Sequence, residues 1–110
     1  MNAEHYTYRV QWSMDDHEYV GTVAEMPSLS WLDEDQEAAF AGIRRLVTEV
    51  VADMEAAGET PPEPISERRF SGRFVVRVGE EIHRRLVLEA AEQKVSLNAL
   101  ASNRLAGSRH

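Results

Sequence analysis

Apolar and polar residues alternate at three places in the first half of the chain. Over 6–13, YTYRVQWS, aromatic and aliphatic side chains occupy every second position, which is the pattern of a half-buried strand. The segment 19–25, YVGTVAE, would return antiparallel to it, and a short third strand would follow around 29–32. From about 36 to 57 the apolar period becomes helical, and Gly58 stands where a helix-ending glycine belongs. This half therefore predicts a small antiparallel sheet with one long helix across it.

The second half shows one more alternating segment, SGRFVVRV at 71–78, followed by two helical segments at about 80–94 and 96–107. No further strand lies nearby, and a lone strand leaves its backbone N–H and C=O groups without partners. A unit of this size is also too small to bury a core alone. We therefore expect two copies to pair their 73–78 strands antiparallel. The expected dimer core consists of Phe74, Val76, Val78, Ile82, Leu86 and Leu100.

The charge of the chain changes sign along its length. The 110 residues carry a formal net charge of −7. Residues 1–64 hold three Arg against 14 Asp and Glu, a net of −11, whereas residues 65–110 hold nine Arg and Lys against five Glu, a net of +4. Three of the four prolines lie between the two parts and favour an extended linker. The chain is therefore expected to comprise an acidic α+β domain at 1–60, a linker at 61–71 and a basic module at 72–110.

Composition excludes several classes of protein. The chain has no Cys, so neither a disulfide framework nor a thiolate metal site is available. No apolar run approaches the length of a membrane span, and the beginning of the sequence lacks the pattern of a signal peptide. We expect a cytoplasmic protein that does not bind membranes.

The acidic residues of the first half do not follow a ligand motif. Most of them lie in turns or at a helix start, where solvation and the helix dipole favour acids. We therefore expect no catalytic residue, no metal and no cofactor. The enzyme alternative is a metal-dependent nuclease built on Asp15, Asp16, Glu25 or Asp33.

The two tryptophans, Trp12 and Trp31, have two interpretations. They can pack between sheet and helix, or at least one of them can be an exposed anchor for a protein partner. An acidic surface with aromatic neighbours suits a basic partner. The candidate residues for that contact, chosen from charge alone, are Trp31, Asp33, Glu34 and Asp35.

The outer face of the expected two-stranded ribbon carries Arg73, Val75 and Arg77 from each copy. Such a ribbon fits the major groove of B-DNA, and Arg is the commonest reader of guanine. The alternative is that both Arg are ordinary solvated residues, because a net charge of +4 is low for a protein that binds DNA by neutralising phosphates.

Residues 72–106 resemble a ribbon-helix-helix domain of the Arc/MetJ type. Over about residues 5–106, the order YTYRVQW…EYVGTVAEMPSLSW, then EAAFAGIRRLVTEVVADMEAAGE, then SGRFVVRVGEEIHRRLVLEAAEQKVSLNAL resembles the HicB family of type II antitoxins. The resemblance implies an N-terminal, partial RNase H-like domain joined to a C-terminal DNA-binding domain. It also implies that the second helix grips a DNA phosphate through backbone N–H groups at Ser96, Leu97 and Asn98.

The function that the resemblance implies is a double one. The N-terminal domain would neutralise a small basic HicA-like toxin that cleaves mRNA. The C-terminal domain would form a homodimer, or part of a tetramer or larger assembly, that represses its own operon at operator DNA. The alternative is a stand-alone ribbon-helix-helix repressor that has no toxin and uses its N-terminal domain to sense or oligomerise. An RNase H-like outline does not imply nuclease activity, because function belongs to the site rather than the fold.

Three positions depart from the pattern of that family. The middle outward position of the strand is often polar, but here it is Val75, which can contact a thymine methyl and cannot hydrogen-bond a base edge. Proline commonly follows the strand, where this chain has Gly79 and Glu80. The position before VSLN is often Gly, but here it is Lys94, which can add a phosphate contact.

Overall fold

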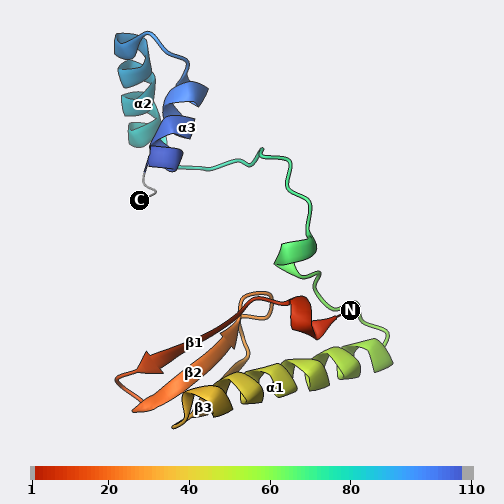
Figure 1. Ribbon diagram of the computed structural model, residues 1–110. Helices are drawn as coiled ribbons and strands as arrows, with labels where there is room; N and C mark the ends of the chain where they lie inside the picture. The colour runs from red at the N-terminus through yellow and green to blue at the C-terminus, as the bar shows by residue number, and fades with distance from the viewer. Residues whose placement is uncertain (1, 108–110) are drawn as a thin grey trace. The chain divides into compact units, whose positions relative to one another are not determined.

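The computed structural model describes residues 2–107 of the chain. The chain divides into two compact units, residues 1–71 and residues 72–110. The first unit contains a three-stranded sheet and a long helix, and the second contains two helices (Figure 1). These elements confirm the predicted α+β class. No helix of the described residues is long and apolar enough to cross a membrane.

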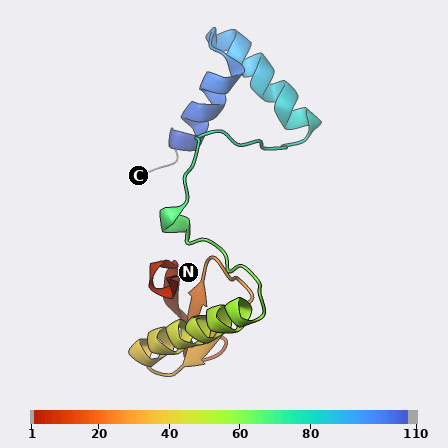
Figure 2. The same cartoon turned by 90° about the vertical axis from the view of Figure 1, so that its right-hand side faces the viewer.

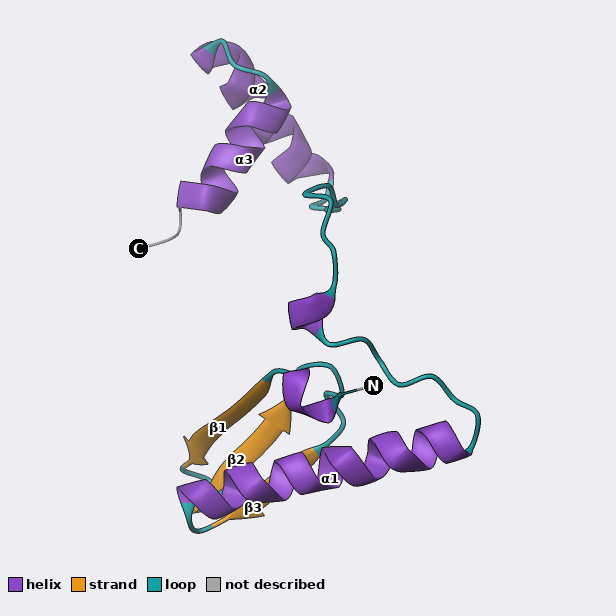
Figure 3. Ribbon diagram, turned by 45° about the vertical axis from the view of Figure 1, so that its right-hand side comes forward, coloured by secondary structure: helices purple, strands orange, loops and turns teal. Residues whose placement is uncertain are grey.

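An antiparallel sheet in the order β1-β2-β3 forms one layer of the first unit, and helix α1 forms the other (Figures 1 and 2). The elements are β1 (Tyr8–Ser13), β2 (Glu18–Val23), β3 (Ser30–Asp33) and α1 (Gln36–Ala56) (Figure 3). A short 3-10 helix, η1 (Ala3–His5), precedes them. Helix α1 contacts all three strands from one side of the sheet. The sheet and the long helix that the sequence predicts are therefore both present.

The core of the first unit lies between α1 and the sheet. Along α1, buried aliphatic residues recur every four positions, as the helical period of the sequence predicts. The core cluster consists of Tyr6, Val23, Met26, Ile43, Val47 and Val51.

Two glycines allow α1 to approach the sheet closely. A Cβ built on Gly21 in β2 would lie 2.9 Å from the backbone oxygen of Ala39 and 2.9 Å from Cγ2 of Ile43. A Cβ built on Gly42 in α1 would lie 2.1 Å from Nε1 of Trp31. Gly21 and Trp31 are paired directly across β2 and β3. The helix and the sheet therefore touch at a point where neither element has room for a larger side chain.

Both ends of α1 carry caps. Asp35 accepts a backbone hydrogen bond in the first turn at 2.9 Å. At the other end Gly58 has φ +79°, its N–H donates to the backbone oxygen of Glu55, and the N–H of Glu59 donates to that of Met54. These two bonds form a Schellman motif, so the helix ends where the sequence predicts.

The proline-rich segment, defined here as residues 61–67, is packed on the first unit. Pro61 and Pro64 are buried, and the backbone oxygen of Pro62 accepts a hydrogen bond of 2.7 Å from the hydroxyl of Tyr6. The segment ends in a second 3-10 helix, η2 (Ile65–Glu67). The sequence predicts a linker over 61–71, and the structure shows instead that its first part belongs to the sheet unit. Apolar, conformationally restricted proline rings lose little entropy when they are buried.

The second unit is a pair of helices, α2 (Glu80–Gln93) and α3 (Leu97–Gly107) (Figure 1). Ala90 of α2 and Leu100 of α3 are buried between them. Arg104 of α3 also forms an ion pair with a Glu of α2. The pair matches the two helical segments that the sequence predicts.

Helix α2 ends in the same Schellman motif as α1, but without a glycine. Lys94 has φ 58° and lies in the left-handed region, where a non-glycine residue is disfavoured. The N–H of Lys94 donates to the backbone oxygen of Ala91, and the N–H of Val95 donates to that of Ala90. Glycine adopts this left-handed conformation more easily than Lys does, so it would be favourable at this position.

Residues 73–79 lead into α2 without forming a strand. Within residues 2–107 they pair with no strand, since the sheet contains only β1, β2 and β3. The strand predicted over 73–78 is therefore absent from a single copy. An alternating sequence becomes a strand only when another strand accepts and donates its hydrogen bonds.

Replacing Gly42 by Ala tests the contact between α1 and the sheet. In an open helix this change stabilises by up to about 1 kcal/mol. Here the new methyl would overlap the indole of Trp31, so we expect the free energy of unfolding to fall by about 1–3 kcal/mol. Urea unfolding followed by tryptophan fluorescence measures this, because both tryptophans lie in the first unit. In a Trp31→Phe background the same change should cost less, and a stabilising Gly42→Ala would contradict the packing described.

Candidate functional site

The second unit has an open apolar surface beside residues 73–79. Phe74, Val76 and Val78 alternate along this segment and are 73%, 58% and 42% exposed. A cavity of about 510 Å³ lies between the segment and the two helices. Its apolar lining consists of Val76, Val78, Leu86, Leu97 and Ala101. The remaining lining residues are Arg77, Gly79, Glu80 and His83. Large apolar side chains around a cavity are typical of a surface that another protein surface covers.

The six residues of the predicted dimer core divide into two groups. Leu100 is buried in a single copy and Leu86 is half-buried. The others are exposed in a single copy: Phe74, Val76, Val78 and Ile82. Within a single copy, therefore, only part of the predicted dimer core is buried.

The predicted DNA-reading residues Arg73, Val75 and Arg77 are all exposed, Val75 at 96%. They occupy the positions between the exposed apolar residues of the same segment. Arg77 and Leu97 line one cavity, so this segment lies next to the start of α3.

The predicted phosphate contacts lie at the beginning of α3. Ser96 caps the helix, since its Oγ accepts a hydrogen bond of 3.0 Å from the N–H of Ala99. Lys94, Ser96 and Asn98 are exposed, and Leu97 is half-buried. The first N–H groups of a helix have no acceptor within the helix and are available to an anion.

In the first unit, Trp31 is not an exposed anchor. It packs against the core on the bare backbone of Gly42, and the guanidinium carbon of Arg45 lies 5.3 Å from the centre of its ring. The first of the two interpretations therefore applies to Trp31. Its indole ring forms the packing contact between β3 and α1.

The three acids predicted to accompany Trp31 surround the start of α1. Oδ1 of Asp33 accepts a hydrogen bond of 2.9 Å from the N–H of Asp35, and Asp35 caps the helix. Glu34 and Asp35 are exposed, and Asp33 is half-buried. Two of these acids thus have local structural roles, although a carboxylate has further lone pairs for a partner.

Trp12 is the exposed tryptophan. It lies in β1 and is 47% exposed. The centre of its ring lies 5.2 Å from that of Tyr19 and 6.4 Å from that of His17. Of the two tryptophans, Trp12 therefore has the exposed ring that the second interpretation requires. Charge alone does not distinguish the two tryptophans, because both have acidic neighbours in the sequence.

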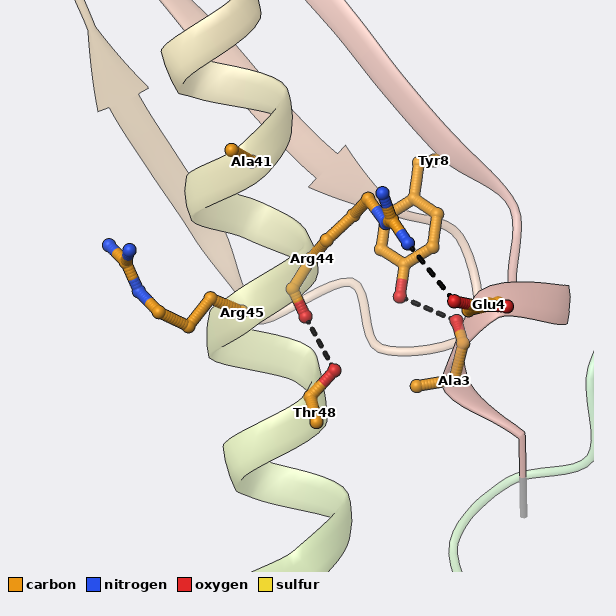
Figure 4. Close-up of a pocket in the computed structure, with 7 residues that line it drawn as sticks. All are labelled: Ala3, Glu4, Tyr8, Ala41, Arg44, Arg45 and Thr48. Atoms are coloured by element: carbon orange, nitrogen blue, oxygen red, sulfur yellow. Dashed lines mark hydrogen bonds and ion pairs between the residues drawn. The ribbon is translucent and has the colours of Figure 1, made fainter.

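A second cavity, of about 290 Å³, lies between η1 and α1 (Figure 4). Two of its polar contacts lie within the protein: Arg44 pairs with Glu4 at 3.4 Å, and the hydroxyl of Tyr8 donates to the backbone oxygen of Ala3 at 2.7 Å. Burial raises the pKa of Tyr8, so its hydroxyl remains a neutral donor. These contacts hold η1 against the sheet unit and do not form a catalytic arrangement.

The acids considered for a nuclease are not gathered into a metal site. Among residues 2–107, no group of three or more His, Cys, Asp or Glu could hold a metal ion. Asp16 accepts a hydrogen bond from the hydroxyl of Ser13 in the hairpin turn. Asp33 and Glu25 bind backbone N–H groups. The geometry therefore gives these carboxylates structural roles.

Glu25 fastens the proline-rich segment to the sheet. Its carboxylate accepts hydrogen bonds from the N–H of Thr7 at 2.9 Å, from the hydroxyl of Thr7 at 3.1 Å and from the N–H of Ile65 at 2.9 Å. Burial by itself would raise the pKa of Glu25, but these hydrogen bonds outweigh it and hold the pKa below its ordinary value. The sequence gives no signal for this role, because the three residues are far apart in the chain.

Replacing Glu25 by Gln should make the first unit less stable at neutral pH. A carboxylate whose pKa is lower in the folded state stabilises the fold above its unfolded pKa, and this contribution is lost as the pH falls through the folded pKa. The difference in melting temperature between wild type and Glu25→Gln should therefore shrink as the pH falls below the ordinary pKa of a glutamate, about 4.3. Tryptophan fluorescence melts measure it. Glu34→Gln, a change at an exposed acid, is the control and should show no such trend, and a constant difference for Glu25→Gln would contradict the role of the charge.

Comparison with known proteins identifies one relationship. The model of the HicB family matches residues 55–105. The match begins in the last turn of α1, runs through the proline-rich segment and residues 73–79, and includes α2 and most of α3. Searches among curated proteins and among solved structures found no match. Over residues 55–105, the chain is therefore similar to proteins of the HicB family.

Proposed function

We propose that this protein is an antitoxin of the HicB type. Its first unit would neutralise a cognate HicA-type toxin that cleaves mRNA, and its second unit would repress the operon that encodes both proteins. It would act in the cytoplasm, without a cofactor and without catalytic activity of its own. The family match suggests a HicB-type antitoxin, and the features of each unit support the finer assignment.

The observation that carries the proposal is the open apolar surface of the second unit. A second copy that pairs its 73–78 segment with the first would supply the missing strand partner and cover the cavity. Covering the exposed parts of Phe74, Val76 and Val78 would contribute favourably at each position, by less than the roughly 1.5–3 kcal/mol for a side chain that is completely exposed beforehand. An isologous pair of this kind is the ribbon-helix-helix arrangement, and it makes the homodimer the DNA-binding species.

DNA binding is supported by the residues that the dimer would expose on its outer face. Pairing of the apolar positions would turn Arg73, Val75 and Arg77 of both copies to the outer face. The backbone N–H groups of Ser96, Leu97 and Asn98 at the start of α3, with Lys94 beside them, would contact phosphates. Arg73 and Arg77 would then read bases, while Val75 would contact a thymine methyl.

Toxin binding is supported by the charge of the first unit. Residues 1–64 carry a net charge of −11, which repels nucleic acid and attracts a basic protein. A toxin that handles RNA requires a basic surface, and an acidic cover would block that surface. The two activities would therefore belong to different units of the chain.

The variants Arg73→Ala and Arg77→Ala test whether DNA binding and toxin neutralisation belong to different units of the chain. Each substitution removes two side chains, one from each copy, so it should weaken binding to the upstream DNA of the chain's own operon by about 30-fold or more, as for the loss of two bidentate contacts to bases. Both should still neutralise the toxin. An electrophoretic shift assay measures the first effect, and growth of cells that express the neighbouring small basic protein measures the second. Arg84→Ala, at an exposed position of α2, is the control for loss of one positive charge.

The proposal would be contradicted if Arg73→Ala or Arg77→Ala released toxicity while the DNA shift persisted. It would also be contradicted for DNA binding if Arg84→Ala weakened the shift as much as the two strand variants, because binding would then depend on charge alone.

A further inference from the structure

Three residues of the sheet line up across its end, next to the start of α1. Trp12 of β1 is paired directly with Tyr19 of β2, and Tyr19 is paired with Asp33 of β3. Directly paired residues share a face of the sheet. This is the face on which α1 lies, because Tyr8, four residues before Trp12 in β1, contacts Phe40 of α1. We call this group the Trp12 row: Trp12, Tyr19 and Asp33.

Two aromatic rings at the contact between α1 and the sheet have an arginine over them, and Trp12 does not. The guanidinium carbon of Arg44 lies 5.4 Å from the centre of the Phe40 ring, and that of Arg45 lies 5.3 Å from the Trp31 ring. Among the residues that the structure describes, no Arg or Lys takes this position on Trp12, although its side chain is about half exposed. Trp is the best of the aromatic side chains at attracting a cation.

The charges around the Trp12 row have one sign. Residues 10–43 contain no Arg or Lys and eight Asp and Glu. Asp15, Asp16 and Glu18 lie in or beside the turn that follows Trp12, and Asp33 lies in the row itself. The exposed ring therefore lies in a segment of the chain whose Asp and Glu residues are not offset by any Arg or Lys, and this charge fits the Arg or Lys side chains of a partner.

We propose that the Trp12 row is the docking surface for a small basic protein, with one of its Arg or Lys side chains stacked on Trp12. The acids attract the partner, and the aromatic ring supplies a cation–π contact. The identity of that protein as the toxin rests on the proposed function, whereas the position and chemistry of the surface do not. Trp12 replaces Trp31 as the aromatic anchor, and Asp33 is kept from the residues that charge alone predicts.

The chemistry of the row excludes the other occupants. A nucleic acid would be repelled by the carboxylates. A second copy of this chain would bring the same carboxylates to the contact, since a two-fold interface sets the same patch on both sides. Only a cationic partner matches both the ring and the charges.

The first experiment uses a defined probe and the wild-type chain. A peptide of ten arginines is titrated into the full-length, isotope-labelled protein, and the indole N–H signals of both tryptophans are followed by NMR. We expect the Trp12 signal to shift with saturation and the Trp31 signal to stay in place, because Trp31 is covered by Arg45 and packed on Gly42. Shifts that spread over the acids and leave Trp12 unchanged would overturn the proposal.

The second experiment uses the small basic protein encoded beside this chain, and binding is measured by calorimetry. Trp12→Ala should weaken binding by about 30-fold or more, as for an aromatic hot spot. Trp12→Phe keeps a ring face and should weaken it by less than about tenfold. Leu32→Ala is the matched control, because Leu32 is 40% exposed in β3 and points to the opposite face from Asp33.

The outcomes separate the two proposals. If wild type binds the basic protein and Trp12→Ala binds it equally well, with an unchanged circular dichroism spectrum, the docking surface is wrong and the antitoxin function stands. If wild type does not bind the basic protein, the antitoxin function is contradicted, and the arginine peptide alone decides whether the Trp12 row is a surface for cations.

Discussion

The apolar surface that residues 73–79, α2 and α3 leave uncovered is the feature on which the proposed account depends. Two helices bury only Ala90 and Leu100 between them, and most of the apolar side chains that precede and line them remain exposed. A unit so small cannot reach a favourable balance of burial and chain entropy on its own. Covering the same surface with a second copy would satisfy the backbone of residues 73–79 and create a face of alternating Arg. Assembly and DNA recognition would thus have one physical cause.

The first unit buries its apolar core within a single chain. Gly21 and Gly42 bring α1 onto the sheet, and Trp31 fills the space beside Gly42. Glu25 and the buried prolines then fasten residues 61–67 to the same body. A closed, acidic unit of this kind presents a surface without depending on dimerisation. Two functions can therefore be placed on one chain and be changed separately by mutation.

Much of this fold could be predicted from the sequence, because hydrophobic period and caps are local signals. The strands of the sheet, α1 with Gly58 after its end, and the two helices of the second unit all follow from such signals. The packing of residues 61–67 could not be predicted, since it depends on Tyr6 and Glu25, which are distant in the sequence. The glycines within β2 and α1 were available as a signal of close backbone approach, because glycine is unfavourable inside both elements. Charge alone selected Trp31, whereas burial shows that Trp12 is the exposed tryptophan.

The central claim is that this chain holds a toxic basic partner with one unit while the other unit represses transcription. Its most direct test is to express the tagged chain from its native operon with both neighbouring genes and to identify by mass spectrometry the proteins that stay bound. The account predicts a stoichiometric small basic protein that is toxic when expressed alone and harmless together with this chain. If no protein is retained while the chain still binds its own upstream DNA, the antitoxin account is contradicted and the protein is a repressor without a toxin.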